Sequence, residues 1–426
     1  MHHLILGAGP AGVIAAETIR KHAPGDQITI VGDEREPPYS RMAIPYLLVG
    51  DIGEPGTYLR KGADHFARQR IELIHAQATK VDAQGKTVTL DNGQTLAFDR
   101  LLIATGSHPV RPPIPGLDLR GVETCWTLQD ARDIATRAVK GARVLQMGAG
   151  FIGCIIMEAL QKRGVQLSVV EMGDRMVPRM MGEVAGNMIR DWCERQGVRV
   201  YTGHKVERIE KGEGDALKVH LSGGTVLDAD LVISATGVRP AIGYLEGSGV
   251  KCLLGVLTDD QMQTNVPGIY AAGDCAEAFD PFTGKTIVSA IQPNAADQAR
   301  VAALNMVGQR AALKLVTQIN VLDTLGLIST SFGNWQGVPG GEQAELTDTA
   351  ACRHLSLQFK DDVLVGCNSV GLTDHVGVMR GLVEGQIRLG DWKDRLLKDP
   401  MRLTEAYLAR AQGQGDWRGA ADARRR

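Results

Sequence analysis

Two glycine-rich hexapeptides carry the clearest chemical signal in this chain. The first is Gly7-Ala8-Gly9-Pro10-Ala11-Gly12, the second is Gly148-Ala149-Gly150-Phe151-Ile152-Gly153, and both follow the pattern G-x-G-x-x-G. Glycines at this spacing permit a tight turn and let backbone N–H groups approach a phosphate closely. A helix that begins there adds the positive end of its dipole, which stabilises a pyrophosphate. Each hexapeptide is therefore a candidate dinucleotide-binding loop.

The residues around each hexapeptide predict the βαβ unit that such a loop needs. The first loop lies between an apolar strand at 3–6 and a helix that runs to His22, followed by a strand at 27–31. The second lies between a strand at 143–147 and a helix to Arg163, followed by a strand at 166–170 that ends on Glu171. One such hexapeptide alone is weak evidence, but this context supports both. We predict an α/β fold with two Rossmann-like domains.

Other patterns predict where these domains begin and end. A strand at 71–74 and a hairpin of 87–90 with 95–98 lie between the loops, and the hairpin turns at Asp91-Asn92-Gly93. The apolar runs at 101–107 and 231–240 each contain Ala-Thr-Gly, and the first continues into a proline-rich stretch. We predict a discontinuous first domain at 1–111 and 241–315, and a second domain at 112–240.

The pattern changes after residue 316. Strands are expected at 318–322, 325–332, 354–359 and 363–369, followed by helices near 374–388 and 391–411. Strands followed by helices indicate a small α+β domain at 316–411. The polar, glycine-rich end, 412–426, is predicted to be a flexible tail.

Composition and charge exclude several function classes. Apolar residues make up 44%, charged residues 23%, and the net charge is −2, so we expect neither nucleic acid nor an anionic membrane as a partner. No apolar stretch approaches the roughly 20 residues that span a bilayer. The strand Leu4-Ile5-Leu6 runs directly into Gly7 and leaves no room for a signal peptide. We therefore predict a cytoplasmic protein.

The cysteines do not form a recognisable redox or metal motif. They are scattered at Cys125, Cys154, Cys193, Cys252, Cys275, Cys352 and Cys367. Their spacing excludes a local C-x-x-C pair, a zinc knuckle or a ferredoxin-type cluster within this chain. We interpret them as buried, inert thiols.

The order of motifs over residues 1 to about 310 resembles the two-dinucleotide-binding flavoprotein superfamily, which has the pyridine nucleotide-disulfide oxidoreductase fold. It is most similar to the ferredoxin and rubredoxin reductases and to the flavin part of assimilatory nitrite reductases. The resemblance implies that the first loop binds FAD. Asp33 or Glu34 would then accept hydrogen bonds from the adenosine ribose, and we favour Glu34.

Three further segments match the family's FAD site. Arg41, in Tyr39-Ser40-Arg41, would approach the phosphates, although a surface arginine is the alternative. Thr105-Gly106 resembles the turn that closes over the cofactor, and Gly273-Asp274 matches the pair that holds the ribityl chain. The helix after Pro293 would aim its N-terminus at the flavin N1/O2 edge. The FAD set implied in this way is Gly7, Gly9, Pro10, Ala11, Gly12, Glu34, Arg41, Ala78, Ala104, Thr105, Gly106, Gly273 and Asp274.

The second loop would bind the nicotinamide cofactor. A carboxylate at Glu171 favours NAD because it chelates the ribose hydroxyls and repels the 2′-phosphate of NADP. The nearby Arg175 leaves NADP open as the alternative. The implied NAD set is Gly148, Gly150, Ile152, Gly153, Glu171 and Gly237.

The departures from the family narrow the chemistry. Disulfide reductases carry C-x-x-x-x-C after the first βαβ unit, and NADH oxidases carry one cysteine near the flavin, but no cysteine precedes Cys125 here. The sequence therefore has no cysteine sulfur at this position for a mechanism that needs a thiolate beside the flavin. Ferredoxin reductases of dioxygenase systems typically pair a lysine and a glutamate at the positions of Tyr46 and Ile155. Tyr46 is interpreted as a cofactor contact or a packed core residue.

These observations predict an FAD-dependent NADH oxidoreductase whose flavin takes a hydride and passes electrons to a separate rubredoxin, ferredoxin or Rieske-type carrier. The flavin carries the chemistry, so no catalytic side chain is assigned. The alternatives are an NADH oxidase or small-molecule reductase, and a non-catalytic protein that senses FAD and NADH. Trp335 is a candidate flavin-edge aromatic or a domain-interface residue, and His375 is given no role. A homodimer through the α+β domain is possible.

Overall fold

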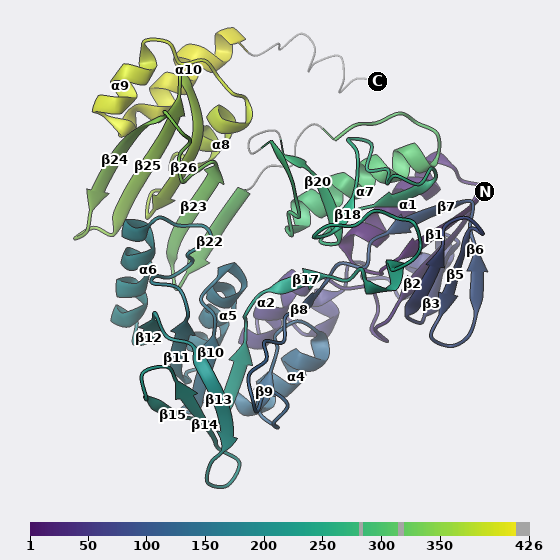
Figure 1. Ribbon diagram of the computed structural model, residues 1–426, viewed down its shortest axis with the longest axis horizontal. Coiled ribbons are helices and arrows are strands. Elements are labelled where there is room, and N and C mark those ends of the chain that lie inside the picture. The colour runs from purple at the N-terminus through teal and green to yellow at the C-terminus, as the bar shows by residue number, and fades with distance from the viewer. Residues whose placement is uncertain (281–283, 314–318, 415–426) are drawn as a thin grey trace. The chain divides into compact units, whose positions relative to one another are not determined.

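The structure is a computed structural model that describes residues 1–280, 284–313 and 319–414 (Figure 1). The chain divides into two compact units. The first comprises Met1–Pro112, Thr124–Thr136 and Thr236–Val316, and the second comprises Pro113–Glu123, Arg137–Ala235 and Thr317–Arg426.

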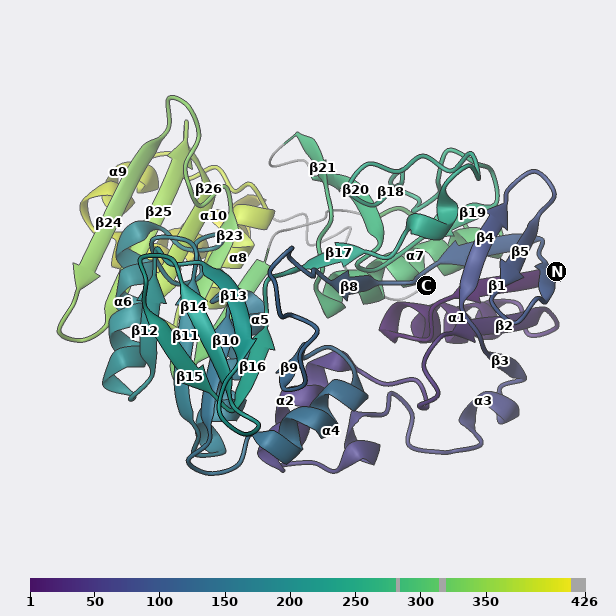
Figure 2. The ribbon, with the colours of Figure 1, turned by 60° about the horizontal axis from the view of Figure 1, so that its bottom comes forward.

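The first unit is built on a five-stranded parallel sheet of order β19-β7-β1-β2-β3. Its strands are β1 (His2–Leu6), β2 (Gln27–Gly32), β3 (Ile71–His75), β7 (Arg100–Ile103) and β19 (Ile269–Ala271). Helices α1 (Pro10–His22) and α7 (Gln292–Met306) pack against each other and against this sheet (Figure 2). Both helices present alanine-rich faces to the core, which lets them approach closely.

Smaller elements complete the first unit. Its other strands are β4 (Ala78–Asp82), β5 (Thr87–Leu90), β6 (Thr95–Ala97), β8 (Ser107–Pro109), β17 (Val238–Pro240), β18 (Val256–Leu257), β20 (Ala276–Asp280) and β21 (Lys285–Ile287). Its other helices are α2 (Ile44–Val49), α3 (His65–Arg68) and α4 (Leu128–Arg137), with 3-10 turns η1 (Arg41–Ala43), η2 (Glu54–Thr57) and η3 (Gly243–Leu245). The antiparallel pairing of β5 with β6 confirms the predicted hairpin.

The second unit repeats the parallel arrangement in the order β12-β11-β10-β16-β9. The strands are β9 (Val122–Glu123), β10 (Arg143–Met147), β11 (Gln166–Glu171), β12 (Arg199–Thr202) and β16 (Leu231–Ser234). Helix α5 (Phe151–Lys162) packs on β10 and β11, and α6 (Glu183–Arg195) packs on β12. An antiparallel sheet of β13 (Val206–Lys211), β14 (Leu217–Leu221) and β15 (Val226–Ala229) adjoins them.

An antiparallel sheet of order β22-β23-β26-β25-β24 also belongs to the second unit. Its strands are β22 (Ile319–Thr324), β23 (Leu327–Gly333), β24 (Glu342–Asp348), β25 (Arg353–Lys360) and β26 (Val363–Val370). Helices α8 (Val376–Glu384), α9 (Trp392–Lys398) and α10 (Leu403–Gln414) follow. Strands followed by helices confirm the predicted α+β character of this part, although β24 was not expected.

Two predictions about the C-terminal part are wrong. The single helix expected at 391–411 is interrupted, because Pro400 cannot continue a helix and the preceding Asp399 is extended. The 3-10 turn η4 (Pro400–Arg402) occupies the break. The expected tail begins too early, because α10 continues to Gln414. Residues 415–426, the rest of that tail, lie outside the described part of the chain.

The three-domain division remains a prediction. The two observed units differ from it at two places: residues 124–136 belong with the first unit, and 317–426 belong with the second nucleotide-binding part. None of the helices in the described part of the chain is both long enough and apolar enough to cross a membrane.

Candidate functional site

The two glycine loops have nearly the same backbone geometry. Gly9, which precedes α1, has φ −77° and ψ −173°, and Gly150, which precedes α5, has φ −77° and ψ −171°. The first glycine of each loop is left-handed, with φ 115° at Gly7 and 96° at Gly148. No side chain caps either helix, so both helix N-termini keep N–H groups available for an anion.

The glycines of the loops serve two different purposes. A Cβ at Gly7 would lie 2.0 Å from the Ala104 carbonyl oxygen, and a Cβ at Gly12 would lie 1.9 Å from that of Gly7. These glycines let the chain itself pack. A Cβ at Gly9 or at Gly150 would meet nothing within 4 Å. The open space beside these two positions fits the pyrophosphate of a dinucleotide.

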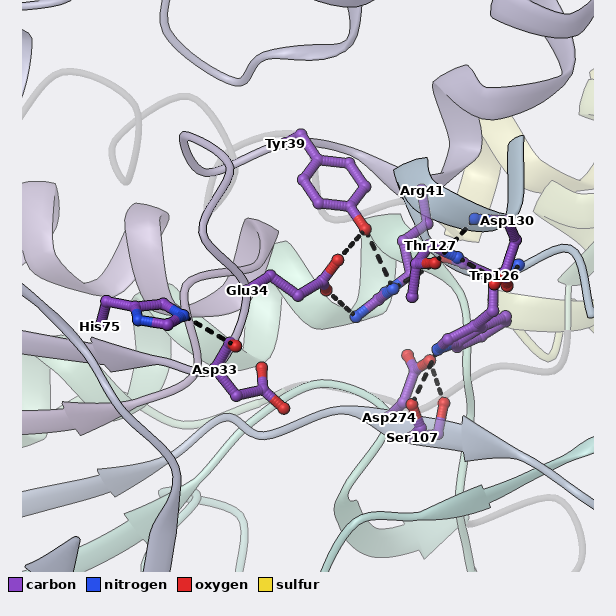
Figure 3. Close-up of polar contacts among 10 residues, drawn as sticks. All are labelled: Asp33, Glu34, Tyr39, Arg41, His75, Ser107, Trp126, Thr127, Asp130 and Asp274. Carbon is purple, nitrogen blue, oxygen red and sulfur yellow. Dashed lines mark hydrogen bonds and ion pairs between the residues drawn. The ribbon is translucent and has the colours of Figure 1, made fainter. Parts of the chain in front are cut away.

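An ion pair links two of the predicted FAD ligands, Glu34 and Arg41 (Figure 3). Arg41 Nη2 lies 2.8 Å from Glu34 Oε1, and the Tyr39 hydroxyl donates to Glu34 Oε2 at 2.6 Å. Arg41 also stacks over the Trp126 ring at 5.2 Å and donates to the Trp126 carbonyl oxygen. Arg41 is therefore held by three neighbouring groups, although its side chain is 35% exposed, and its role at the phosphates remains a prediction. Asp33 is exposed and takes no part in this cluster, although its carbonyl oxygen contacts His75.

A second group of polar residues surrounds Asp274. Ser107 donates its hydroxyl to Asp274 Oδ2 at 3.0 Å, and the Trp126 indole N–H donates to the Ser107 carbonyl oxygen at 3.0 Å. Burial raises the pKa of Asp274 above its ordinary value, while the Ser107 hydrogen bond and the positive charge of Arg41 oppose that shift. Gln298, buried in α7, accepts from the N–H of Gly273 at 2.8 Å and so fixes the turn. A partly buried carboxylate held in this way suits hydroxyl donors such as those of a ribityl chain.

The remaining predicted FAD residues lie in the same unit. Ala104 is buried at the end of β7, and Gly106 is left-handed with φ 67°. Thr105 donates to the Ala241 carbonyl oxygen at 2.8 Å, which ties the turn to the chain beyond residue 240. Ala78 begins β4 and packs partly on the core, without a described contact to the other predicted ligands.

The carboxylate of Glu171 is hydrogen-bonded to the second loop. Its Oε2 accepts from the N–H of Ala149 at 2.7 Å, and its Oε1 accepts from the N–H of Gly173 at 2.8 Å. The carboxylate therefore lies beside the glycine loop, where ribose hydroxyls are expected to bind. Arg175 donates to the Met181 carbonyl oxygen at 3.0 Å and pairs with Asp174. Its guanidinium is engaged within the protein.

Three other predicted residues of this set have defined places. Gly153 lies in the first turn of α5, where a Cβ would stand 2.5 Å from the Gly148 carbonyl oxygen. Ile152 is partly exposed at the start of the same helix. Gly237 is left-handed with φ 107° but belongs to the first unit, where its carbonyl oxygen accepts from Val110. All site assignments to individual ligands remain predictions.

Sequence reasoning missed several residues of these clusters. Tyr39 was used only as part of a motif, and Ser107, Trp126 and Gln298 were not proposed as site residues at all. Their partners are 5, 167, 19 and 25 positions away. A tryptophan two positions before a helix, and a glutamine on the alanine-rich face of α7, were signals that could have found two of them.

Two side chains are exposed in the segment that carries cysteine in thiol-dependent relatives, whereas Ile44 between them is buried. Met42 is 48% exposed and Tyr46 is 57% exposed, so the packed-core interpretation of Tyr46 is wrong. Five of the seven cysteines are buried as expected, whereas Cys125 and Cys252 are only partly buried. Cys275, next to Asp274, is fully buried, and burial raises its pKa to about 11. In the described residues, no group of three potential metal ligands is present.

The sequence matches the family described as pyridine nucleotide-disulphide oxidoreductase over residues 1–302. The chain belongs to this family. It is an FAD-dependent NAD(P)H oxidoreductase, and its cofactors are FAD and NAD. The α/β fold with Rossmann-like sheets is thereby confirmed.

Several relatives of this oxidoreductase are similar over much of their length. A subunit epsilon of NADH-dependent phenylglyoxylate dehydrogenase from Aromatoleum evansii is 33% identical, over 96% of this chain and 97% of the relative. An NADH oxidase from Methanocaldococcus jannaschii is 31% identical, over 87% and 88%. The ferredoxin–NAD(+) reductase of the biphenyl dioxygenase system from Paraburkholderia xenovorans is 32% identical, over 64% and 66%.

The fold of this oxidoreductase is also found in a solved complex. The covalent putidaredoxin reductase–putidaredoxin complex matches with a TM-score of 0.87 and 24% identity, covering 96% of this chain and 98% of that chain. At this identity the match concerns the fold alone.

His375 and Trp335 lie in the second unit. His375 precedes α8 and contacts Thr404 Oγ1 at 3.0 Å. Trp335 is partly exposed on the turn after β23. Its assignment to the flavin edge remains a prediction.

Proposed function

We propose that this oxidoreductase takes two electrons from NADH and delivers them through FAD to a separate electron-carrier protein. The observation that carries the proposal is the burial of Cys275, whose pKa is raised to about 11 beside the predicted FAD site. A thiol of this kind stays protonated near neutral pH and is a poor relay. Electrons must then leave by another route than a neighbouring thiolate.

Bound FAD supplies the chemistry, because it accepts a hydride and releases electrons one or two at a time. The chain's own residues bind and orient the two cofactors. Gly9 and the N-terminus of α1 would receive the pyrophosphate, Arg41 would neutralise phosphate charge, and Asp274 would accept from hydroxyl groups. In the second unit, Glu171 would accept from the ribose of NADH. No proton transfer by a side chain is required.

Relatives support a protein as the acceptor. Besides the biphenyl dioxygenase component, similar chains include a ferredoxin–NAD(+) reductase subunit of benzene 1,2-dioxygenase from Pseudomonas putida, 31% identical, and a rhodocoxin reductase from Rhodococcus erythropolis, 30% identical. We transfer from them the class of partner, a small redox protein such as a ferredoxin, a rubredoxin or a Rieske-type protein. As part of the proposal we place the reaction in the cytoplasm, since all seven cysteines are free thiols.

A second candidate function is the direct reduction of oxygen or a small molecule, favoured by the similar NADH oxidase. The phenylglyoxylate dehydrogenase relative is named as a subunit, so a subunit that stays bound is another candidate acceptor. Both alternatives keep the NADH and FAD sites unchanged and differ only in the acceptor.

Anaerobic stopped-flow with NADH, followed by a panel of carriers, tests the proposal. We expect NADH to bleach the flavin absorbance rapidly, and reoxidation to require an added ferredoxin, rubredoxin or Rieske-type protein. Rapid reoxidation by oxygen alone, with no gain from any carrier, would support the oxidase instead. Failure of NADH to reduce the flavin would contradict both and favour a non-catalytic sensor.

A further inference from the structure

The segment after Glu171 contacts both the Glu171 carboxylate and the NAD glycine loop. We call residues 173–182 the strap. At its start, the N–H of Gly173 donates to Glu171 Oε1 at 2.8 Å. In its middle, the N–H of Val177 donates to the Ala149 carbonyl oxygen at 2.9 Å. The N–H of the same Ala149 donates to Glu171 Oε2. The strap therefore fixes both the loop and the carboxylate expected to bind NADH.

The other end of the strap is held by the C-terminal sheet. Asn368, on β26, donates from Nδ2 to the Met180 carbonyl oxygen at 3.0 Å and accepts at Oδ1 from the N–H of Gly182 at 3.0 Å. Its side chain is buried, with 2% exposure. One carboxamide thus satisfies a donor and an acceptor of the strap, from a position 186 residues further along the chain. Both partners belong to the second unit.

The strap conformation is strained and needs support. Val177 has φ 49°, in the left-handed region that a β-branched residue strongly disfavours, and it is 1% exposed. Such a conformation persists only where the surroundings determine it. The N–H groups of Met180 and Met181 both donate to the Val177 carbonyl oxygen. Val177 therefore begins a turn whose other end is hydrogen-bonded to Asn368.

Close packing on α6 also constrains the strap. A Cβ at Gly186 would lie 2.7 Å from the Met176 carbonyl oxygen and 2.8 Å from Arg175 Cδ. The absence of a side chain at Gly186 lets the strap lie directly on the helix. Contacts on α6, on β26 and on the glycine loop therefore leave the strap little freedom.

We infer that Asn368 is a positioning residue for the nicotinamide dinucleotide: it holds the strap in the strained conformation that places Ala149 and Glu171 for binding. The inference rests on the proposed NADH site and gives the C-terminal sheet a part in cofactor binding. Asn368 itself need not touch the dinucleotide, because its effect passes through Met180, Val177 and Ala149.

The test compares equilibrium binding of NAD⁺ to the FAD-loaded wild type and to Asn368→Ala, measured by calorimetry so that no turnover is needed. We expect the dissociation constant to rise roughly three- to thirtyfold, or about 0.7–2 kcal/mol. FAD content should stay unchanged. Amide hydrogen exchange of 173–182 should become faster. The matched control is Ser369→Ala, which removes the neighbouring buried contact to Thr330 (2.7 Å) without touching the strap.

A second variant distinguishes positioning from general destabilisation. Glycine adopts positive φ without steric strain, so Val177→Gly should restore much of the NAD⁺ affinity that Asn368→Ala loses. If the double variant binds more weakly than Asn368→Ala, or if Asn368→Ala binds as the wild type does, the inference is wrong. If the wild type itself does not bind NAD⁺, the proposed function fails instead. Asn368→Ser, which is too short to reach both partners, replaces the alanine variant if that variant does not fold.

Discussion

The guanidinium of Arg41 and the carboxylate of Glu34 form an ion pair with a separation of 2.8 Å, and the Tyr39 hydroxyl contacts both side chains. This arrangement brings together two residues that the sequence assigned to different parts of FAD. A dinucleotide needs both kinds of group within a short span, since its phosphates are anionic and its ribose hydroxyls donate. The pair therefore supplies a cation and an acceptor side by side.

Arg41→Met should weaken FAD binding roughly ten- to a hundredfold, because a charge-assisted hydrogen bond is worth about 1.5–3 kcal/mol. Quenching of flavin fluorescence during titration of the apoprotein measures the change. Arg60→Met is the control, since Arg60 pairs with Glu17 in the same unit but outside the predicted site. Equal losses in the two variants would show that Arg41 acts only on stability.

Gly9 and Gly150 provide a matched pair of variants. A Cβ at either position meets nothing within 4 Å, and neither residue is left-handed, so the protein tolerates alanine there. We expect Gly9→Ala to lower FAD content while leaving the melting temperature of the apoprotein unchanged. Gly150→Ala should retain FAD and weaken NADH binding. Loss of FAD from Gly150→Ala, with Gly9→Ala unaffected, would reverse the assignment of the two loops.

NADH should reduce the flavin with a kcat/KM well above that for NADPH. Glu171→Ser should lower the ratio of the kcat/KM for NADH to that for NADPH. Loss of a bidentate contact to ribose typically costs about 1–3 kcal/mol, or roughly ten- to a hundredfold in affinity. Steady-state kinetics with both nucleotides measures the ratio. Glu210→Ser, which removes an exposed carboxylate of β13 in the same unit, should leave the ratio unchanged. Equal use of both nucleotides by the wild type would show that Glu171 does not select.

The two βαβ units could be predicted because their signals are local. An apolar strand, a glycine loop and an amphipathic helix follow one another within about 30 residues, and the strand and helix bounds at α1 and α5 agree with the prediction to within one or two positions. The glycines that close these turns are recognised for the same reason. Pro400 is also a local signal for the end of a helix, but the helical pattern predicted at 391–411 extends past it.

The other strands and the contacts of the site depend on residues far apart in the sequence, which no local pattern predicts. Strands β13 and β24 are largely exposed and carry charges, so they resemble loops in composition. The hydrogen-bonded residues Ser107 and Asp274 are 167 positions apart in the sequence. Asn368 and its partner Gly182 in the strap are 186 positions apart. Such partners are chosen by tertiary packing, which one sequence does not reveal.

The buried thiols should make the protein less stable in alkali. Burial raises the pKa of Cys275 to about 11 and that of Cys154 to about 12, whereas an unfolded cysteine titrates near about 8.5. The folded state keeps protons that the unfolded chain loses, so this stability is complete below pH ~8.5 and declines as the pH rises toward the folded pKa. Urea unfolding of Cys275→Ala between pH ~9 and ~10.5 should show a slope shallower by up to ~1.4 kcal/mol per pH unit. An unchanged slope in Cys275→Ala would contradict the argument.

The last prediction concerns the reaction class. Cys275 is the cysteine adjacent in sequence to Asp274, and its sulfur contacts the carbonyl oxygens of Ile103 and Ala272 at 3.4 Å. These contacts bury it in the core rather than present it to a cofactor. Reduction by NADH should therefore stop at the two-electron flavin, without the thiolate-to-flavin charge-transfer absorbance of disulfide reductases. Cys275→Ala, with FAD still bound, should be reduced at nearly the wild-type rate in anaerobic stopped-flow. A large fall in that rate would mean that a thiol takes part and that delivery to a carrier is the wrong assignment.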